Sequence, residues 1–392
     1  MMKKQYSHLV LFLSLCTLTA CNDSKNEDSI DPDPLPPSIT YHVEGYAELG
    51  AFDHNSTLTV FPLDKSLAHI EEQAYGGKVE TDYGLFSASG NMKFQESLYF
   101  EVQVTGNFFN GTKGRRSEHK TTLRAINHVI NHDDEERSIN RYIKLPVTNV
   151  NIFTQLTAAR ICTLLKKAAG YNEMSHTITD IYRNASEQAL KEVLTAFSIS
   201  DIYVSMLSID PTRASFSQYN APASMMAAVS NILLTSVDEE LLDTFFTEWD
   251  KDFAPDGCID NEDIKESIRD GQQSLKYTNV YKQLDSFYKA YDFKSDFPEF
   301  WKFVDRNGDG ILDKQDKPDD FEITEEELTP SKQQCIQLLE QVNKYLRDFL
   351  QTECVWEANF CGAIGPIPDY PTTLVPTDSE VYEIWTAAYA TI

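Results

Sequence analysis

Residues 305–316 place oxygen-bearing side chains at nearly every second position of a short segment. Calcium is a hard cation that takes about six to eight oxygen ligands, so a loop that wraps round it must offer oxygens at this spacing. Gly310 permits the sharp turn that such a loop needs, and the main-chain carbonyl of Ile311 adds a further oxygen. The spacing therefore predicts a calcium site. Its side-chain ligands are expected to be Asp305, Asn307, Asp309, Asp313 and Asp316.

The order of these residues resembles the calcium loop of EF-hand and dockerin proteins. An aspartate in the closing place, Asp316, is the dockerin-like form, and its short side chain implies a weaker site than a glutamate would give. Apolar residues between Phe297 and Val304 stand at helical spacing before the loop and predict an entering helix. The alternative is a solvated acidic turn without a metal.

A second acidic segment, residues 250–263, follows the same order less closely. Before Asp256 the register breaks, and two alignments stay open. Either Asp252 takes the first position and Ala254 supplies no ligand, or two residues are inserted and Asp250 takes the first position. The segment is thus a weaker calcium candidate, with a metal-free structural loop as the alternative. Its candidate ligands are Asp250, Asp252, Asp256, Cys258, Asp260 and Asp263.

Other patterns that carry chemistry give no site. His128 and His132 stand four residues apart beside aspartates, but without an HExxH motif they are expected to be a surface histidine pair. The sequence has no GxSxG motif, phosphate loop or glycine-rich dinucleotide turn, and its acidic residues are too numerous for a glycosidase pair to stand out. No catalytic residue is assigned.

The elements expected to position the two loops change in type along the chain. Short segments alternate at period two up to about residue 145, with Gly, Asn and Asp between them, which predicts strands. Beyond Pro146 the apolar residues recur at helical spacing. Strands are expected at 41–47, 56–61, 83–86, 98–104 and 121–125, and helices at 158–169, 185–197, 225–234, 239–249, 279–291 and 332–350.

The first residues predict an exported, lipid-anchored protein. Lys3 and Lys4 precede an apolar run, residues 9–18, which is shorter than the roughly 20 residues of a spanning helix. The segment ending at Cys21 resembles the bacterial lipobox, which implies cleavage after residue 20 and acylation of Cys21; an ordinary secretory signal is the alternative. Polar and proline-rich residues follow Cys21, and we expect them to form an extended tether.

The expected fold class is α+β and multi-domain, with an N-terminal antiparallel β-sandwich followed by a mainly α-helical domain with EF-hand-like loops. The expected segments are a signal peptide at 1–20, a tether at 21–40, the β-sandwich at 41–145, a helical domain at 146–240, an EF-hand-like helical region at 241–325, and a C-terminal helix and tail at 326–392. Five cysteines follow Cys21, so at least one is unpaired or pairs with another chain, and a Cys354–Cys361 bridge stays open.

The net charge of −27 bears on the partners. Phosphate contacts dominate nucleic-acid affinity, and a chain with this negative charge is therefore not expected to bind DNA or RNA. An acidic surface suits calcium, cationic partners or simple solubility outside the cell. No second apolar run approaches spanning length, so the lipid at Cys21 is the expected membrane attachment.

Several runs of residues resemble a recurrent, largely uncharacterised family of Bacteroidetes-type surface lipoproteins. The resemblance implies a domain plan and a place at the outer membrane, with the cell surface favoured over the periplasmic face, but no activity. The favoured function is a non-enzymatic, calcium-binding module whose partner is a glycan or an envelope protein; the alternative is a surface hydrolase of polysaccharide or peptide. The runs are 45–52, 56–60, 63–64, 81–86, 106–114, 149–160 and 188–197.

Overall fold

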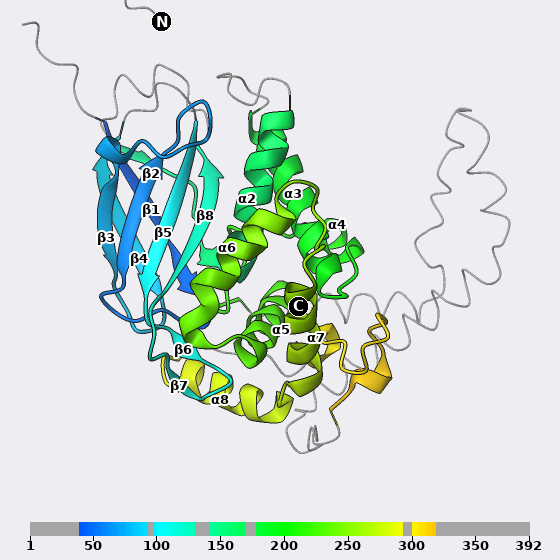
Figure 1. Ribbon diagram of the computed structural model, residues 1–392. Coiled ribbons are helices and arrows are strands. Elements are labelled where there is room, and N and C mark those ends of the chain that lie inside the picture. Colours follow the sequence, from blue (N-terminus) through cyan, green and yellow to red (C-terminus); the bar gives the residue numbers. More distant parts are fainter. Residues whose placement is uncertain are drawn as a thin grey trace, which may run out of the picture.

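The computed structural model describes residues 39–92, 98–129, 142–168, 178–218, 220–292 and 300–318. These residues form an α+β structure, with a curled mixed sheet in the N-terminal half and helices after it (Figure 1). The predicted signal peptide, the lipid attachment at Cys21, His132 and the C-terminal region 326–392 lie outside the described residues.

The sheet contains eight strands within the described residues, in the order β10-β1-β4-β3-β2-β5-β8, with β9 also paired to β1. Neighbours run antiparallel except β9 and β10, which run parallel to β1. The strands are β1 (Thr40–Glu48), β2 (Thr57–Pro62), β3 (Tyr75–Val79), β4 (Leu85–Asn91), β5 (Tyr99–Gly106), β8 (Thr121–His128), β9 (Tyr142–Lys144) and β10 (Val150–Asn151).

The sheet curls until its two edges meet. Asn127 lies near the end of β8, and Thr148 lies just before β10. The Asn127 Nδ2 atom donates a hydrogen bond to Thr148 Oγ1 at a distance of 2.9 Å. A β-carbon at Gly45 would lie 2.3 Å from the carbonyl oxygen of Thr148, so glycine is needed where this segment crosses β1. The predicted β-sandwich is corrected, because the described strands form one curled sheet and a small ribbon. Period-two alternation indicates a buried face but not which sheet a strand joins.

Helix α2 (Ile152–Lys167) begins six residues before the predicted start and packs on β8. Asn151 and Thr154 form a capping box: the Asn151 side chain accepts from Thr154 N, and Oγ1 of Thr154 accepts from Asn151 N. The prediction missed this start because the third helical position carries Thr where the usual pattern has Glu or Gln.

Helix α5 is buried along most of its length and packs against α7 and α2. Where α7 crosses α5, a β-carbon at Gly271 would lie 2.3 Å from the carbonyl oxygen of Ile232. No helix in the described ranges is both long and apolar enough to cross a membrane. The helices are α3 (Ile178–Ala196), α4 (Ile202–Met206), α5 (Ala221–Ser236), α6 (Leu242–Phe253), α7 (Glu262–Ser274) and α8 (Tyr277–Lys289).

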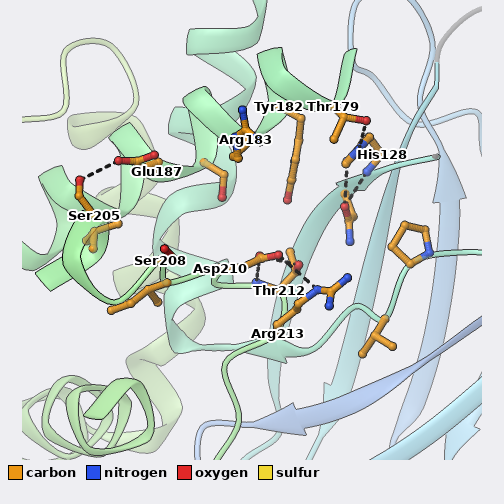
Figure 2. Close-up of a pocket in the computed structure, with 16 residues that line it drawn as sticks. His128, Thr179, Tyr182, Arg183, Glu187, Ser205, Ser208, Asp210, Thr212 and Arg213 are labelled. Carbon is orange, nitrogen blue, oxygen red and sulfur yellow. Dashed lines mark hydrogen bonds and ion pairs between the residues drawn. The ribbon is translucent and has the colours of Figure 1, made fainter. Parts of the chain in front are cut away.

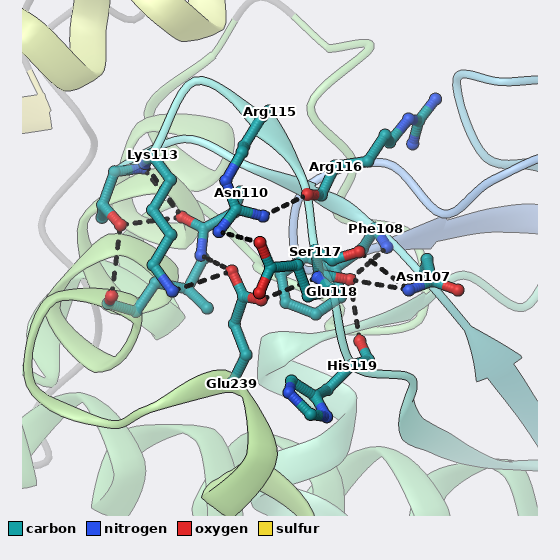
Figure 3. Close-up of polar contacts among 12 residues, drawn as sticks. Asn107, Phe108, Asn110, Lys113, Arg115, Arg116, Ser117, Glu118, His119 and Glu239 are labelled. Atoms are coloured by element: carbon teal, nitrogen blue, oxygen red, sulfur yellow. Dashed lines mark hydrogen bonds and ion pairs between the residues drawn. The ribbon is translucent and has the colours of Figure 1, made fainter.

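A two-stranded ribbon, β6 (Phe109–Asn110) and β7 (Arg115–Arg116), ties the sheet to the helices (Figure 3). Buried Glu239 accepts hydrogen bonds from Asn110 Nδ2 and from the main-chain N–H of Glu118, each at 2.8 Å. It also forms an ion pair with Lys113 Nζ at 3.1 Å. Phe109 stacks on Phe287 of α8 with ring centroids 4.1 Å apart. The sheet and the helices are thereby joined by polar and apolar contacts.

The buried apolar residues form one cluster that extends from Tyr41 to Val304. The sheet also continues past the predicted boundary at residue 146, because β10 lies beyond it. Independent folding of residues 41–145 stays a prediction.

Candidate functional site

The 305–316 loop lies between two short 3-10 helices, η3 (Phe300–Phe303) and η4 (Lys314–Asp316), beside α7 (Figure 1). Phe300, Phe303 and Val304 are buried and fix the start of the loop in the core. The described part of the predicted entering helix is the 3-10 turn η3. Leu312 packs against the core as an anchor.

Two buried carboxylates close the loop from its two ends. Asp305, 3% exposed, accepts from the N–H of Gly308 (2.8 Å) and of Gly310 (2.9 Å). Asp316, 1% exposed, accepts from the N–H of Arg306 (2.8 Å) and of Asp313 (2.9 Å). Main-chain donors from across the loop thus hold both acidic side chains inside it.

The remaining side chains form local turns with the loop's own main chain. Asn307 Oδ1 accepts from Asp309 N over 2.9 Å, and Asp309 Oδ1 accepts from Ile311 N over 2.8 Å. Gly308 and Gly310 have φ values of 73° and 78°, in the left-handed region that favours glycine. Within the described residues, no group of three or more acidic, His or Cys side chains is close enough to hold a metal.

The donor chemistry nevertheless fits calcium. Asp305 and Asp316 are buried, and in the described part of the chain no Lys, Arg or His nitrogen lies within ion-pair distance of them. Burial of a charge is costly without a compensating partner. A carboxylate has about four lone-pair positions, so main-chain N–H groups leave capacity for a cation. Carboxylates, the Asn307 amide and the Ile311 carbonyl are the hard oxygen ligands that calcium prefers.

The second acidic segment is divided between two environments. Asp250 belongs to α6, and its Oδ2 accepts from Arg124 Nη2 of β8 over 2.5 Å. Asp252 Oδ2 instead accepts from the N–H groups of Asp260 (2.9 Å) and Asn261 (3.1 Å). Asp256 caps its own turn through Cys258 N, while Cys258, Asp260 and Asp263 are exposed.

Arg160 occupies the carbonyl oxygens of this second segment. Its guanidinium, 4% exposed, donates to the carbonyls of Ala254 (3.2 Å), Pro255 (2.9 Å) and Asp256 (2.9 Å). It also pairs with both oxygens of Glu192 at 2.7 and 2.9 Å. An internal cation therefore already lies against the main chain of this segment. Its positive charge opposes a metal ion at the same place, so this geometry favours the metal-free alternative for residues 250–263.

Asp250 and Arg124 are part of a buried polar group that the sequence did not indicate. Glu101 of β5 accepts from His69 Nε2 at 3.0 Å and lies 3.7 Å from Arg124. Burial raises the pKa of Asp250 to about 6, against the opposing charge of Arg124. Burial also acts to raise the pKa of Glu101, but its contacts with His69 and Arg124 outweigh this and lower it. These residues come from distant segments, so no spacing in the sequence links them.

A pocket of about 510 Å³ lies between α3, α4 and the end of β8 (Figure 2). His128 lines it and is buried, so its predicted place at the surface was wrong. The predicted pair of histidines was assigned to a loop, but His128 is the last residue of β8. The His128 ring packs on the Tyr182 ring, with centroids 4.7 Å apart.

No protein-family description, characterised protein or solved structure shows significant similarity to this chain.

Proposed function

We propose that this protein is a lipid-anchored, calcium-stabilised binding module on the outer surface of a bacterial outer membrane, with EF-hand-like binding at residues 305–316. The observation that carries the proposal is the pair of buried carboxylates, Asp305 and Asp316, which have main-chain donors but no basic side chain among the described residues. The partner is a glycan or an envelope protein, and Cys21 carries the acyl chains.

Calcium should act on stability through mass action. An ion that binds the folded loop and not the unfolded chain stabilises the fold by about 2.7 kcal/mol at a hundred times its dissociation constant. Extracellular modules bind calcium at roughly 10⁻⁴–10⁻³ M, and the short side chain of Asp316 gives no reason for tighter binding. Stabilisation is therefore expected at millimolar calcium.

A thermal-unfolding series with and without calcium tests this. The melting temperature of the full chain should rise with millimolar calcium and fall when a chelator is added. Asp309→Ala should remove most of the rise, because Asp309 offers an exposed carboxylate that otherwise accepts from Ile311 N and Asn307 Nδ2 within the loop. Asp252→Ala is the matched control and should leave the rise intact. Absence of both heat and thermal shift in a calcium titration would leave 305–316 a plain acidic turn.

The anchor is tested separately. Cys21→Ser should abolish acylation and move the protein from the membrane fraction to the soluble fraction, because a diacylated cysteine is a stable attachment and no helix of the described residues could span a membrane in its place. Metabolic labelling with a fatty acid gives the readout. Label that persists in the Ser variant would contradict the assignment of Cys21.

A further inference from the structure

The pocket described above is bounded by α3 on one side and by the segment from Val204 to Arg213 on the other (Figure 2). Its volume of about 510 Å³ falls within the roughly 300–1,000 Å³ that is typical of small-ligand sites. Its wall mixes apolar side chains with hydroxyl, carboxylate and guanidinium groups. The arrangement of these groups indicates what kind of ligand fits.

A chain of hydrogen bonds runs to the pocket from the meeting edges of the sheet. Thr148 Oγ1 donates to the carbonyl of Pro146 over 2.8 Å, so it must accept from Asn127 Nδ2. The amide oxygen of Asn127 therefore points to His128 and accepts from its main-chain N–H over 2.8 Å. The same oxygen lies 3.2 Å from Nδ1 of His128, which must be the protonated ring nitrogen.

The donor-to-acceptor direction of these hydrogen bonds determines the role of the last residue in the series, Thr179. With Nδ1 protonated, Nε2 of neutral His128 is an acceptor, and Thr179 Oγ1 lies 3.1 Å from it. Thr179 must then donate its only proton to His128 and offers lone pairs to the pocket. Burial lowers the pKa of His128 to about 4, so the ring stays neutral at pH 7 and is too weak a base for efficient proton transfer. The geometry suits binding of a hydroxyl donor.

The charges round the pocket balance one another. Asp210 lies 3.6 Å from Arg213, and Arg183 lies 2.7 Å from Asp180. Glu187 accepts from Ser205 over 2.8 Å and pairs with Lys191. Paired charges of both signs give no net field for a strongly charged ligand. They offer planar donors and acceptors that suit hydroxyl groups.

Apolar side chains supply the rest of the surface. Val204 and Ile209 are buried in the wall, and Tyr182 is held in place because its hydroxyl donates to the carbonyl of Ile126 over 2.6 Å. A ligand with hydroxyl groups on its edges and C–H groups on its faces satisfies both parts of this wall. Sugars have that combination.

We propose that this pocket binds one or two residues of a neutral oligosaccharide, with a sugar hydroxyl donating to Thr179 Oγ1. The proposal gives a ligand class to the proposed binding role and rests on it. It requires neither calcium nor acylation, so the two proposals can fail separately.

The test is calorimetric titration of the full chain with neutral glucose, mannose, galactose and N-acetylglucosamine trisaccharides, in buffer with calcium and in buffer with chelator. At least one neutral probe should bind with a dissociation constant below about 1 mM, a value at which about 4 kcal/mol of binding energy is available. Binding to none of the neutral probes, or only to an anionic oligosaccharide or a peptide, overturns the proposal.

Three variants locate the binding site. Thr179→Val replaces the acceptor oxygen by a methyl group and should weaken binding about tenfold, whereas Thr179→Ser should restore it. Thr195→Val removes a hydroxyl from the same helix outside the pocket and should have no effect. Equal affinity in Thr179→Val and Thr195→Val would place the sugar elsewhere and overturn the assignment.

A second pair of variants does not depend on one hydrogen bond. Ser205→Trp fills the pocket from α4 and should abolish binding, while Ile202→Trp, at an exposed position of the same helix that does not line the pocket, should not. Unchanged melting temperatures verify that both variants fold. Sugar binding that survives Ser205→Trp in a folded protein contradicts the proposal.

Discussion

Glu48 makes the stability of this fold depend on pH in a way that can be worked out in advance. The residue ends β1 and is 1% exposed. Its carboxyl group accepts from Phe216 N and Ser215 Oγ, both at 3.1 Å. Burial, only partly offset by these two hydrogen bonds, raises its pKa from 4.5 to about 8. Tyr46 and Tyr288 lie near it, and burial raises the pKa of each, so both stay neutral over the range considered.

The sign follows from the proton count. Between pH 4.5 and 8 the folded chain holds a proton on Glu48 that the unfolded chain has lost, so the free energy of unfolding must fall as pH rises. The loss is about 1.4 kcal/mol per pH unit while the group stays protonated in the fold. From pH 6 to pH 8 this amounts to about 2.5 kcal/mol. Glu48→Gln mimics the neutral acid and removes this contribution.

Urea unfolding of both proteins at pH 6 and pH 8 gives the measurement. The two free energies of unfolding should be similar only below about pH 4.5, where Glu48 is protonated in both states. The advantage of the Gln variant should be larger at pH 8 than at pH 6 by about 2.5 kcal/mol. His69, whose pKa is raised by Glu101, also loses stability with rising pH, but it does so in both proteins and cancels. Glu44→Gln, at a half-exposed position of the same strand, should show no such gain at pH 8. Parallel pH profiles for Glu48→Gln and the parent protein would refute the reasoning.

Two further substitutions test how the parts are joined. Arg160→Met removes the guanidinium that donates to Glu192 and to three carbonyl groups and should cost about 3–5 kcal/mol in urea unfolding, whereas Arg269→Met, at an exposed position of α7, should cost less than about 0.5 kcal/mol. Gly45→Ala forces a methyl group to within 2.3 Å of Thr148 O and should cost about 1–3 kcal/mol, while Gly76→Ala, whose nearest neighbour is 3.5 Å away, should be milder. Equal losses within either pair would count against the contacts described.

Local patterns predicted the elements better than their arrangement. Alternation located β1, β2, β5 and β8, and it located only the first two residues of β4. It missed β3, whose Tyr75–Val79 segment contains two glycines. It also missed β9 and β10, which are too short to alternate visibly and join β1 only because the chain returns to it. Parallel pairing and curling depend on contacts between distant segments, which periodicity does not encode.

The two candidate loops show the same limit. Spacing alone predicts the 305–316 loop, because its candidate ligands are all local to one turn. Spacing left 250–263 undecided, since what distinguishes it is Arg160, about ninety residues away in sequence. The pocket was missed for the same reason. His128 and Thr179 meet across fifty-one residues, and neither stands in a motif.

Four residues of the runs 45–52, 106–114 and 149–160 lie where the parts of this fold join. Gly45 lets the chain cross β1, Asn110 binds Glu239 in the ribbon, and Asn149 bridges Tyr46 N and Ala214 O. Asn151 caps α2. None of the pocket-lining side chains falls within the runs that carry the resemblance. The joints therefore depend on residues other than those that line the pocket. Substitutions in the pocket can change what it binds without removing the joints.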